Sequence, residues 1–209
     1  QVLLNKYYKR RRHRYHPTIQ STESATMTNR LDQIITRTGD DGTSALADGT
    51  RLSKSHPRFS AMGDVDELNS NIGALRSTLN DVTDAKLNEF LAHIQHHLFE
   101  IGSELAVPGM TFLRAGALDE VEHWAEQANA QLPALKEFIL PSGNISAAQA
   151  HICRSVARRA ERAMVTLNQT EAQNEASLKY LNRCSDVFFI MARLLNQNAQ
   201  VTETYWRGV

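Results

Sequence analysis

The densest charge in the sequence is a run of four arginines within nine residues, from Arg154 to Arg162. Arg154, Arg158 and Glu161 are spaced i, i+4 and i+7, so they share one face of a helix. Arg159 and Arg162 lie beside them. The planar guanidinium of arginine binds phosphate oxygens through two parallel hydrogen bonds and keeps its charge. The run therefore predicts an anion site, and the alternative is a solvated helix face on which Glu161 relieves the repulsion.

A second candidate for phosphate chemistry is the loop from Thr36 to Ser44, which is rich in glycine and hydroxyl residues. Such a loop offers backbone N–H groups and hydroxyls to an anion, and Lys54 is nearby. It does not match the P-loop, because no Gly-Lys-Ser/Thr sequence closes it. Asp40 and Asp41 are negative like phosphate, but a magnesium ion on a triphosphate would accept a carboxylate. A plain turn is the alternative.

Three acidic residues, Asp64, Asp66 and Glu67, lie early in the helix that is predicted to follow Pro57. Acids in a first turn interact favourably with the helix dipole, so helix capping is the simplest interpretation. The alternative is a buried pair between one of these acids and an arginine.

Histidines mark a possible metal site on the next predicted helix. His93 and His97 are spaced i, i+4, which permits metal chelation, and His96 lies beside them. In a helical bundle, a di-iron carboxylate site needs two Glu-x-x-His pairs. The sequence has only one, Glu120–His123, so surface histidines are favoured over a metal site.

The cysteines and the apolar runs limit the location of the protein. Cys153 and Cys184 form no Cys-x-x-Cys motif, which predicts buried free thiols and argues against a disulfide scaffold or a zinc ribbon. No apolar run approaches the ~18–20 residues of a transmembrane helix. We therefore expect a cytoplasmic protein without a membrane partner.

Helical periodicity dominates the chain after Pro57, which suits the first turn of a helix. Ser146, with Gln149 three residues later, predicts a capping box at the start of another helix. The apolar stripe of the first helix, stepping by three and four residues, is Val65, Leu68, Ile72, Leu75 and Leu79. The other predicted helices are Asp84–Ala106, Gly116–Gln131, one that starts at Ser146, and Glu175–Asn198.

These elements predict one helical domain. Residues 29–56 are rich in Gly, Asp, Thr and Ser, and we expect a loop with a short hairpin there. Five amphipathic helices with short connections predict an all-α, up-and-down five-helix bundle. No series of strands supports a parallel sheet, which argues against a Rossmann domain.

Basic charge is concentrated near the N-terminus. Residues 1–26 hold six lysines or arginines and one acid, Glu23, and the remaining residues hold 17 basic and 22 acidic side chains. The segment Lys6–Tyr15 could bind nucleic acid or an anionic membrane, act as a transit peptide, or lie outside the fold. Met27, followed by a plausible domain start, favours the last. We therefore predict a disordered basic extension over 1–28, a domain over 29–209 and no nucleic-acid partner.

Three separated blocks of the sequence resemble the PduO-type ATP:cob(I)alamin adenosyltransferases. They are TRTGDDGTS with the following Lys54; HPRFSAMGDVDELNSNIGALRS; and FILPSGN, RSVARRAER and LKYLNRCSDVFFIMAR. The resemblance runs from Thr36 to about Trp206. It implies a five-helix bundle that assembles as a homotrimer with active sites between subunits. It also implies ATP, Mg²⁺ and cobalamin as ligands, and a reductase and an adenosylcobalamin-dependent acceptor enzyme as partners.

The resemblance also implies roles for individual residues. Arg158 would meet the triphosphate, and Asp66 would pair across the subunit interface with Arg154. Phe138 would lie under the corrin ring. No side chain is assigned directly to the metal, because Mg²⁺ would arrive on ATP. The implied ATP-binding residues are Thr36, Arg37, Thr38, Gly39, Ser44, Lys54, Arg158, Arg159, Glu161, Arg162 and Asn182.

The sequence departs from the family pattern at three places. Asp41 stands where the family often has lysine, which removes a positive charge beside the phosphates. Ala157 stands where cysteine is frequent. The turn Pro141–Asn144 reads PSGN where PGG is commoner, which leaves the geometry of that turn open.

In the reaction that the resemblance implies, Co(I) attacks the ribose 5′ carbon of ATP and inorganic triphosphate leaves. The protein must align these groups and stabilise the charge on the leaving group. Phe138, packed where a lower ligand would sit, would favour four-coordinate cobalt and make Co(II) easier to reduce. From sequence alone, a core aromatic beside Ile139 and Leu140 is the favoured interpretation of Phe138. The alternative function is a bundle that holds ATP or delivers adenosylcobalamin without catalysis.

Overall fold

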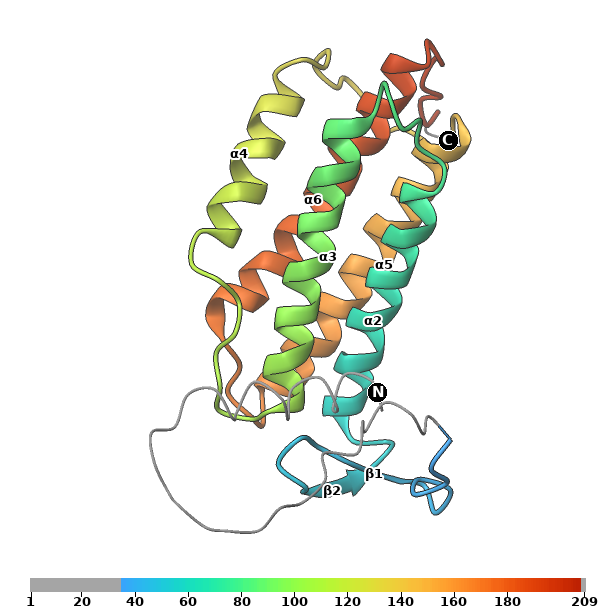
Figure 1. Ribbon diagram of the computed structural model, residues 1–209. Helices are drawn as coiled ribbons and strands as arrows, with labels where there is room; N and C mark the ends of the chain where they lie inside the picture. The colour runs from blue at the N-terminus through green and yellow to red at the C-terminus, as the bar shows by residue number, and fades with distance from the viewer. Residues whose placement is uncertain (1–34, 208–209) are drawn as a thin grey trace.

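Five helices follow a short hairpin in the computed structural model, which describes residues 35–207 (Figure 1). The predicted all-α bundle is confirmed, and the helix limits agree to within a few residues. Leu79, the last residue of the first apolar stripe, lies beyond the end of its helix but still packs against the core. The helices are α2 (Pro57–Arg76), α3 (Ala85–Ala106), α4 (Ala117–Asn129), α5 (Ile145–Asn168) and α6 (Glu175–Asn198).

Successive helices run in opposite directions, which gives the predicted up-and-down order (Figure 1). α5 packs between α2 and α6, while α3 packs on α2, and α4 packs on α6. Fully buried leucines and isoleucines of α2 and α3, such as Leu68 and Ile94, face Met164 of α5 and Phe188 of α6 in one hydrophobic core. The helices therefore present their polar faces, including the arginine run of α5, away from that core.

The predicted hairpin is confirmed at one end of the bundle. Strands β1 (Thr43–Ala45) and β2 (Arg51–Ser53) pair antiparallel, with Ser44 opposite Leu52. Ala47, just after β1, donates a backbone hydrogen bond to the carbonyl of Ala106 at the end of α3 (3.0 Å). The hairpin is therefore fixed to the end of the bundle where α2 begins and α3 ends (Figure 1).

Of the two helix starts predicted from sequence signals, the one at Pro57 is confirmed and the cap at Ser146 is not. Pro57 occupies the first turn of α2, as predicted, and the His56 ring accepts a hydrogen bond from the Arg58 N–H. The predicted capping box at Ser146 and Gln149 is wrong. Asn144 caps α5 by accepting from the Ala147 N–H (2.7 Å), because the helix begins one residue earlier. Ser146 instead hydrogen-bonds to Thr78, just after α2, and Gln149 hydrogen-bonds to Asn71 of α2.

A small ribbon closes the opposite end of the bundle. Ile139 pairs antiparallel with Tyr205, and two backbone hydrogen bonds flank the pair. Arg193, buried on α6, donates to Glu203 (Nε–Oε1 2.9 Å) and to the Pro133 carbonyl (2.9 Å). One arginine therefore holds the C-terminal segment and the segment before α5 together.

The turn of the sequence PSGN is fixed by Asn196 of α6. The Asn196 amide donates to the Ser142 carbonyl (3.2 Å), and its Oδ1 accepts from the Asn144 N–H (3.1 Å). Gly143 has φ +122° and packs so closely on Asn196 that an added Cβ would overlap its amide group. Glycine is therefore required there both by the backbone and by the space.

The predicted basic extension, residues 1–28, lies outside the described residues, and the boundary at residue 29 stays a prediction. Within residues 35–207, every helix is too short or too polar to cross a membrane.

We predict that Gly143→Ala lowers the free energy of unfolding by about 2–4 kcal/mol, because it combines a strained φ with a steric overlap. Gly109→Ala is the matched control, since Gly109 also has positive φ (+79°) but has open space around it. Its cost should stay near ~1 kcal/mol. Chemical denaturation measures both, and equal losses in the two variants would show that the contact with Asn196 contributes nothing.

Candidate active site

Arg159 is the one arginine of the run that is neutralised within the described chain. Its Nε donates to Asp64 Oδ1 of α2 (3.0 Å), and its Nη2 pairs with Glu67. The hydrogen bonds that Arg159 donates to Glu67 and Asp64 raise the pKa of Arg159. Interpreting these acids as first-turn caps is wrong, because they lie beyond the first turn of α2. Asp64 and Glu67 instead pair with an arginine, which was the alternative prediction, but this ion pair is partly exposed and not buried.

Arg158 and Arg162 are exposed and have no acidic partner within residues 35–207. They lie one helical turn apart on α5 and so present two guanidinium groups to the same region of solvent. No ion pair within the described part of the chain relieves their mutual repulsion, which solvent or an anion would reduce. The anion site that the sequence predicts on this run stays a prediction, and Arg158 and Arg162 are the residues of the run that are free to bind an anion.

Arg154, one turn earlier on α5, has an unusual environment. Its Nε is buried and lacks a hydrogen-bond partner among the described residues. Burial and the neighbouring charge of Arg158 lower the pKa of Arg154. Buried polar atoms are nearly always hydrogen-bonded, so the described chain leaves this arginine incomplete.

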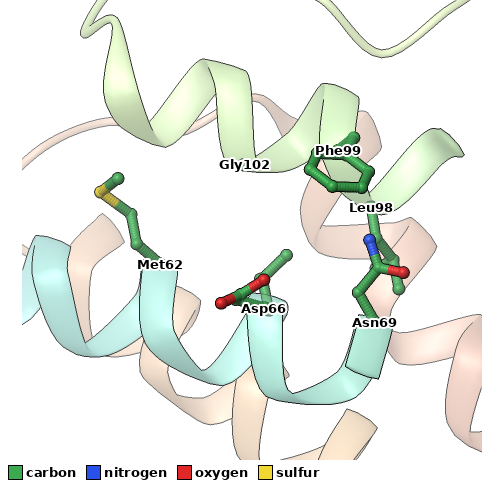
Figure 2. A pocket seen from close by; sticks show the side chains of 7 residues that line it. Met62, Asp66, Asn69, Leu98, Phe99 and Gly102 are labelled. Carbon is green, nitrogen blue, oxygen red and sulfur yellow. The ribbon is translucent and has the colours of Figure 1, made fainter. Parts of the chain in front are cut away.

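Asp66, the predicted partner of Arg154, faces elsewhere in the same chain. Figure 2 shows Met62, Asp66 and Asn69 pointing from α2 towards α3, where they line a shallow groove with Phe99 and other residues. Asp64, two residues earlier, faces α5 instead. Since residues two apart lie on nearly opposite sides of a helix, Asp66 does not reach Arg154 of its own chain.

Two further predicted ATP residues are brought together by a polar network between helices. Asn182 of α6 donates to Glu161 Oε1 of α5 (2.8 Å) and accepts from Arg183 Nη1 (2.7 Å). Arg183 Nε in turn donates to Glu122 of α4 (2.7 Å). The network fixes the side chain of Asn182 beside the arginine run.

The loop before the hairpin brings together Gly39 and Lys54. An added Cβ on Gly39 would lie 3.0 Å from the Thr43 carbonyl oxygen and 3.1 Å from Lys54 Nζ, so glycine gives the lysine room to lie close to the backbone here. The hydroxyls of Thr36 and Thr38 are hydrogen-bonded to each other (3.0 Å), and Arg37 has positive φ (56°). The loop thus places an ammonium group against a backbone bend lined with hydroxyls. Ser44 lies in β1 beside it.

Asp41 has a structural role in this loop. Its Oδ1 accepts from the Thr43 N–H (2.9 Å) and the Thr43 hydroxyl (2.8 Å). These hydrogen bonds, with the nearby charge of Arg51, lower the pKa of Asp41. Arg51 also donates to the Thr38 carbonyl (2.7 Å). Asp41, at the position where the family often has lysine, is therefore held in the turn and forms an ion pair with Arg51.

Phe138 lies on the surface, with 79% of its area exposed. The interpretation of Phe138 as a core aromatic is therefore wrong. The reason is the ribbon, which sends alternate side chains to opposite faces and leaves Phe138 on an open one. The segment between α4 and α5, which contains Phe138, and the segment before β1, which contains Gly39, lie at opposite ends of the bundle (Figure 1).

The family model described as cobalamin adenosyltransferase matches residues 34–195. The chain belongs to this family. It is 51% identical to a cobalamin adenosyltransferase from Cupriavidus metallidurans over 181 residues, covering 87% of this chain and 97% of the relative. It is 38% identical to the corrinoid adenosyltransferase MMAB from Homo sapiens over 180 residues, covering 82% of this chain and 72% of the relative. This family member is thus an enzyme of the transferase class.

Solved structures agree with this family. A variant of the PduO-type ATP:corrinoid adenosyltransferase from Lactobacillus reuteri, complexed with cobalamin and ATP, superposes with a TM-score of 0.80. It is 35% identical and covers 84% of this chain and 100% of its own. Another variant of that enzyme, complexed with ATP, has a TM-score of 0.79 and 36% identity, with 83% of this chain and 100% of its own covered.

The histidines of this cobalamin adenosyltransferase family member do not converge on a metal. His93 bonds to Glu120 (2.7 Å), whereas His97 is buried and bonds to the Tyr180 hydroxyl (2.8 Å) and Arg114 (2.7 Å). Residues 35–207 contain no group of three or more metal-ligating side chains. The interpretation as surface histidines is wrong for His97.

The predicted buried thiols are confirmed. Both Cys153 and Cys184 are buried and free. Burial raises the pKa of Cys153 to about 12 and raises the pKa of Cys184 as well, so neither thiol is a nucleophile near neutral pH.

Sequence reasoning missed the C-terminal ribbon and the residues that hold it, Arg193, Asn196 and Glu203. The signal was present as Thr202–Trp206, a short run after the last helix that holds two threonines and two aromatic residues, which favour strands. A strand with a single bridge partner is too short to be recognised by periodicity alone.

We predict that His97 makes the stability of this family member depend on pH. Arg114 Nε–H donates to His97 Nε2, so the ring is neutral with its proton on Nδ1. Burial, with the charge of Arg114, lowers the pKa of His97 from 6.5 to about 4. Between those values the unfolded chain binds a proton and the folded chain does not. Stability should therefore fall by up to about 3 kcal/mol as the pH drops from 6.5 to 4.

Urea denaturation across this pH range measures the effect. His97→Gln should show a shallower dependence than the parent chain, while His96→Gln, at an exposed position on the same helix, should follow the parent. Identical slopes in the parent and His97→Gln would contradict the assignment.

Proposed function

We propose that this family member transfers the 5′-deoxyadenosyl group of ATP to cob(I)alamin. The electron pair of Co(I) forms the bond to the ribose 5′ carbon, the bond from that carbon to oxygen breaks, and inorganic triphosphate leaves with its electrons. The observation that carries the proposal is the exposed pair Arg158 and Arg162, which have no acidic partner among residues 35–207, in a chain whose solved relatives hold ATP and cobalamin.

The charged residues act on the leaving group. As the carbon–oxygen bond breaks, negative charge accumulates on the triphosphate, and fixed positive groups lower the energy of that state. Arg158 and Arg162 supply this charge from α5, and Lys54, which lies close to Gly39 of the loop, supplies it from the hairpin end. Asn182, held by Glu161, presents a fixed amide beside them. Magnesium would arrive bound to the phosphates, and the exposed carboxylate of Asp40 fits the role of an outer contact.

The site draws on two subunits of a homotrimer. Within residues 35–207 of one chain, the Nε of Arg154 is buried without a hydrogen-bond partner, and Asp66 lines the groove between α2 and α3. If Asp66 of one subunit accepts a hydrogen bond from Arg154 of the next subunit, each side chain gains a partner of opposite charge. The loop leads into the same α2 that carries Asp66, so this pairing brings the loop of one chain to the arginines of another.

Phe138 contacts the lower face of the corrin. Its exposed ring excludes water and any oxygen or nitrogen ligand from that side of the cobalt. Four-coordinate Co(II) accepts an electron more readily, which produces the nucleophilic Co(I). A reductase supplies the electron, and an enzyme that uses adenosylcobalamin accepts the product.

The first test is the visible spectrum of protein mixed with ATP, Mg²⁺ and chemically reduced cobalamin. The parent chain should convert cob(I)alamin to adenosylcobalamin, whereas Arg158→Ala should lose at least ~100-fold in kcat while remaining folded. Lys86→Ala removes an exposed cation of α3 to which no role is assigned in the proposed site, and it should keep parental turnover. Binding of ATP without conversion by the parent would indicate a carrier instead of an enzyme, and near-parental turnover by Arg158→Ala would contradict the site.

The second test reverses the proposed intersubunit pair. Asp66→Arg and Arg154→Asp should each weaken the trimer and the activity, because each places like charges together across the interface. The double variant restores an opposite pair and should recover most of the assembly. Sedimentation velocity gives the oligomeric state. Full trimers in both single variants would exclude this ion pair. Equal dissociation of the two single variants and the double variant would also count against it.

A further inference from the structure

We infer that Arg51 is a second cation of the hairpin end, beside Lys54, that binds the triphosphate, and that Asp41 holds its guanidinium in place. This inference rests on the proposed function. It assigns a role to the ion pair between Arg51 and Asp41, which the proposed function leaves unused, and it names the ligand class as a polyphosphate anion.

Arg51 is the first residue of β2, and its side chain reaches across the hairpin to the loop before β1. Its Nη2 donates to the Thr38 carbonyl (2.7 Å), and its Nε donates to the Thr43 hydroxyl (3.0 Å). Asp41 Oδ1 lies 3.4 Å from the same Nη2. Acceptors from three residues therefore fix the plane of the guanidinium, whereas a single exposed ion pair would leave it mobile.

Arg51 and Lys54 meet the loop at one peptide group, the one between Thr38 and Gly39. Arg51 donates to the carbonyl of that group, and Lys54 Nζ would lie 3.1 Å from a Cβ added to Gly39. The Lys54 N–H also donates to the Gly42 carbonyl (2.9 Å), so the hairpin fixes the position of both cations. A phosphate that Lys54 binds would therefore lie near Arg51 as well.

The guanidinium of Arg51 keeps donors for an anion. Its side chain is 42% exposed. Within residues 35–207, its hydrogen bonds use Nε and Nη2. A guanidinium has five N–H donors, so the two on Nη1 remain for a ligand. Held in a fixed plane, these donors match the oxygens of a phosphate and lose little freedom on binding.

Asp41 opposes the binding of an anion while it positions Arg51. Its hydrogen bonds from Thr43 lower its pKa, so the carboxylate is charged near neutral pH. Without Arg51, the loop would present two adjacent carboxylates, Asp40 and Asp41, to a phosphate. Removing the cation and removing the acid should therefore change the affinity for triphosphate in opposite directions. A pair that only shaped the loop would give losses of the same sign.

The test measures steady-state kinetics with ATP and the inhibition constant of inorganic triphosphate. Arg51→Ala should raise the KM for ATP about tenfold and raise the inhibition constant in parallel, because a charge-assisted contact is lost. The KM for cob(I)alamin should stay within about twofold. Asp41→Asn keeps a side-chain oxygen that can accept from the Thr43 N–H, and it should lower the KM for ATP about twofold.

Two further comparisons separate charge from loop structure. Adding Asp41→Asn to Arg51→Ala should lower the KM for ATP relative to Arg51→Ala alone, because the unpaired carboxylate is gone. Arg51→Lys, which keeps the charge, should lie between the parent and Arg51→Ala. Glu175 and Lys179 form an exposed ion pair on α6 (2.6 Å) to which no role is assigned. Glu175→Gln and Lys179→Ala are the matched controls and should leave both constants unchanged.

The outcomes separate this inference from the proposed function. If the parent chain converts cobalamin and Arg51→Ala keeps the parental KM for ATP, or Asp41→Asn raises that KM as Arg51→Ala does, the inference is wrong and the function stands. If the parent chain binds triphosphate in calorimetry without converting cobalamin, and Arg51→Ala weakens that binding, the function fails and the inference stands. Should Arg51→Ala not fold, Asp41→Asn decides alone, since a KM that does not fall overturns the inference.

Discussion

The repulsion among the arginines of α5 is the constraint on which the rest of the site depends. Like charges one helical turn apart destabilise a helix unless opposite charges or a ligand compensate them. The chain compensates Arg159 internally, through Asp64 and Glu67, and that bridge also ties α5 to α2. Arg158 and Arg162 are left for an anion. Arg154, buried at Nε, requires a partner that the described part of its own chain does not supply.

The distance between the two ends of the bundle explains why one chain would not suffice to form the proposed site. The loop with Lys54 lies at the end where α2 begins, and the ribbon with Phe138 lies at the other end (Figure 1). Because a helix of 24 residues such as α5 extends ~36 Å, these groups cannot meet around one cobalt and one ribose within a single chain. In the assembly that we propose, α2 of one chain meets α5 of another, so that residues of two chains contribute to one site. The unsatisfied Arg154 and the outward Asp66 are the local signs of such an assembly.

Sequence alone predicts the bundle well, because the periodic apolar residues from Val65 to Leu195 are the core that is observed. It predicts the cationic character of α5 for the same reason, since helical spacing fixes which residues share a face. It does not predict which arginine is neutralised, because Asp64 and Glu67 are 95 and 92 residues from Arg159 along the chain. The exposure of Phe138 was mispredicted because its neighbours Ile139 and Leu140 suggest a core strand, and the partner strand has no periodic signal. The role of Asp41 depends on Thr43 and Arg51 across a hairpin whose register the sequence leaves open.

The measurement that tests the two-chain site most directly is subunit complementation. Lys54→Ala removes the loop cation and Arg158→Ala removes the helix cation, and each homotrimer should be nearly inactive. When the two variants are coexpressed in equal amounts and assemble at random, about a quarter of the interfaces contain an intact loop opposite an intact α5, so turnover should recover to about a quarter of the parental value. Trimers that assemble with both variants present, yet show no activity above that of the separate variants, would contradict a site shared between subunits.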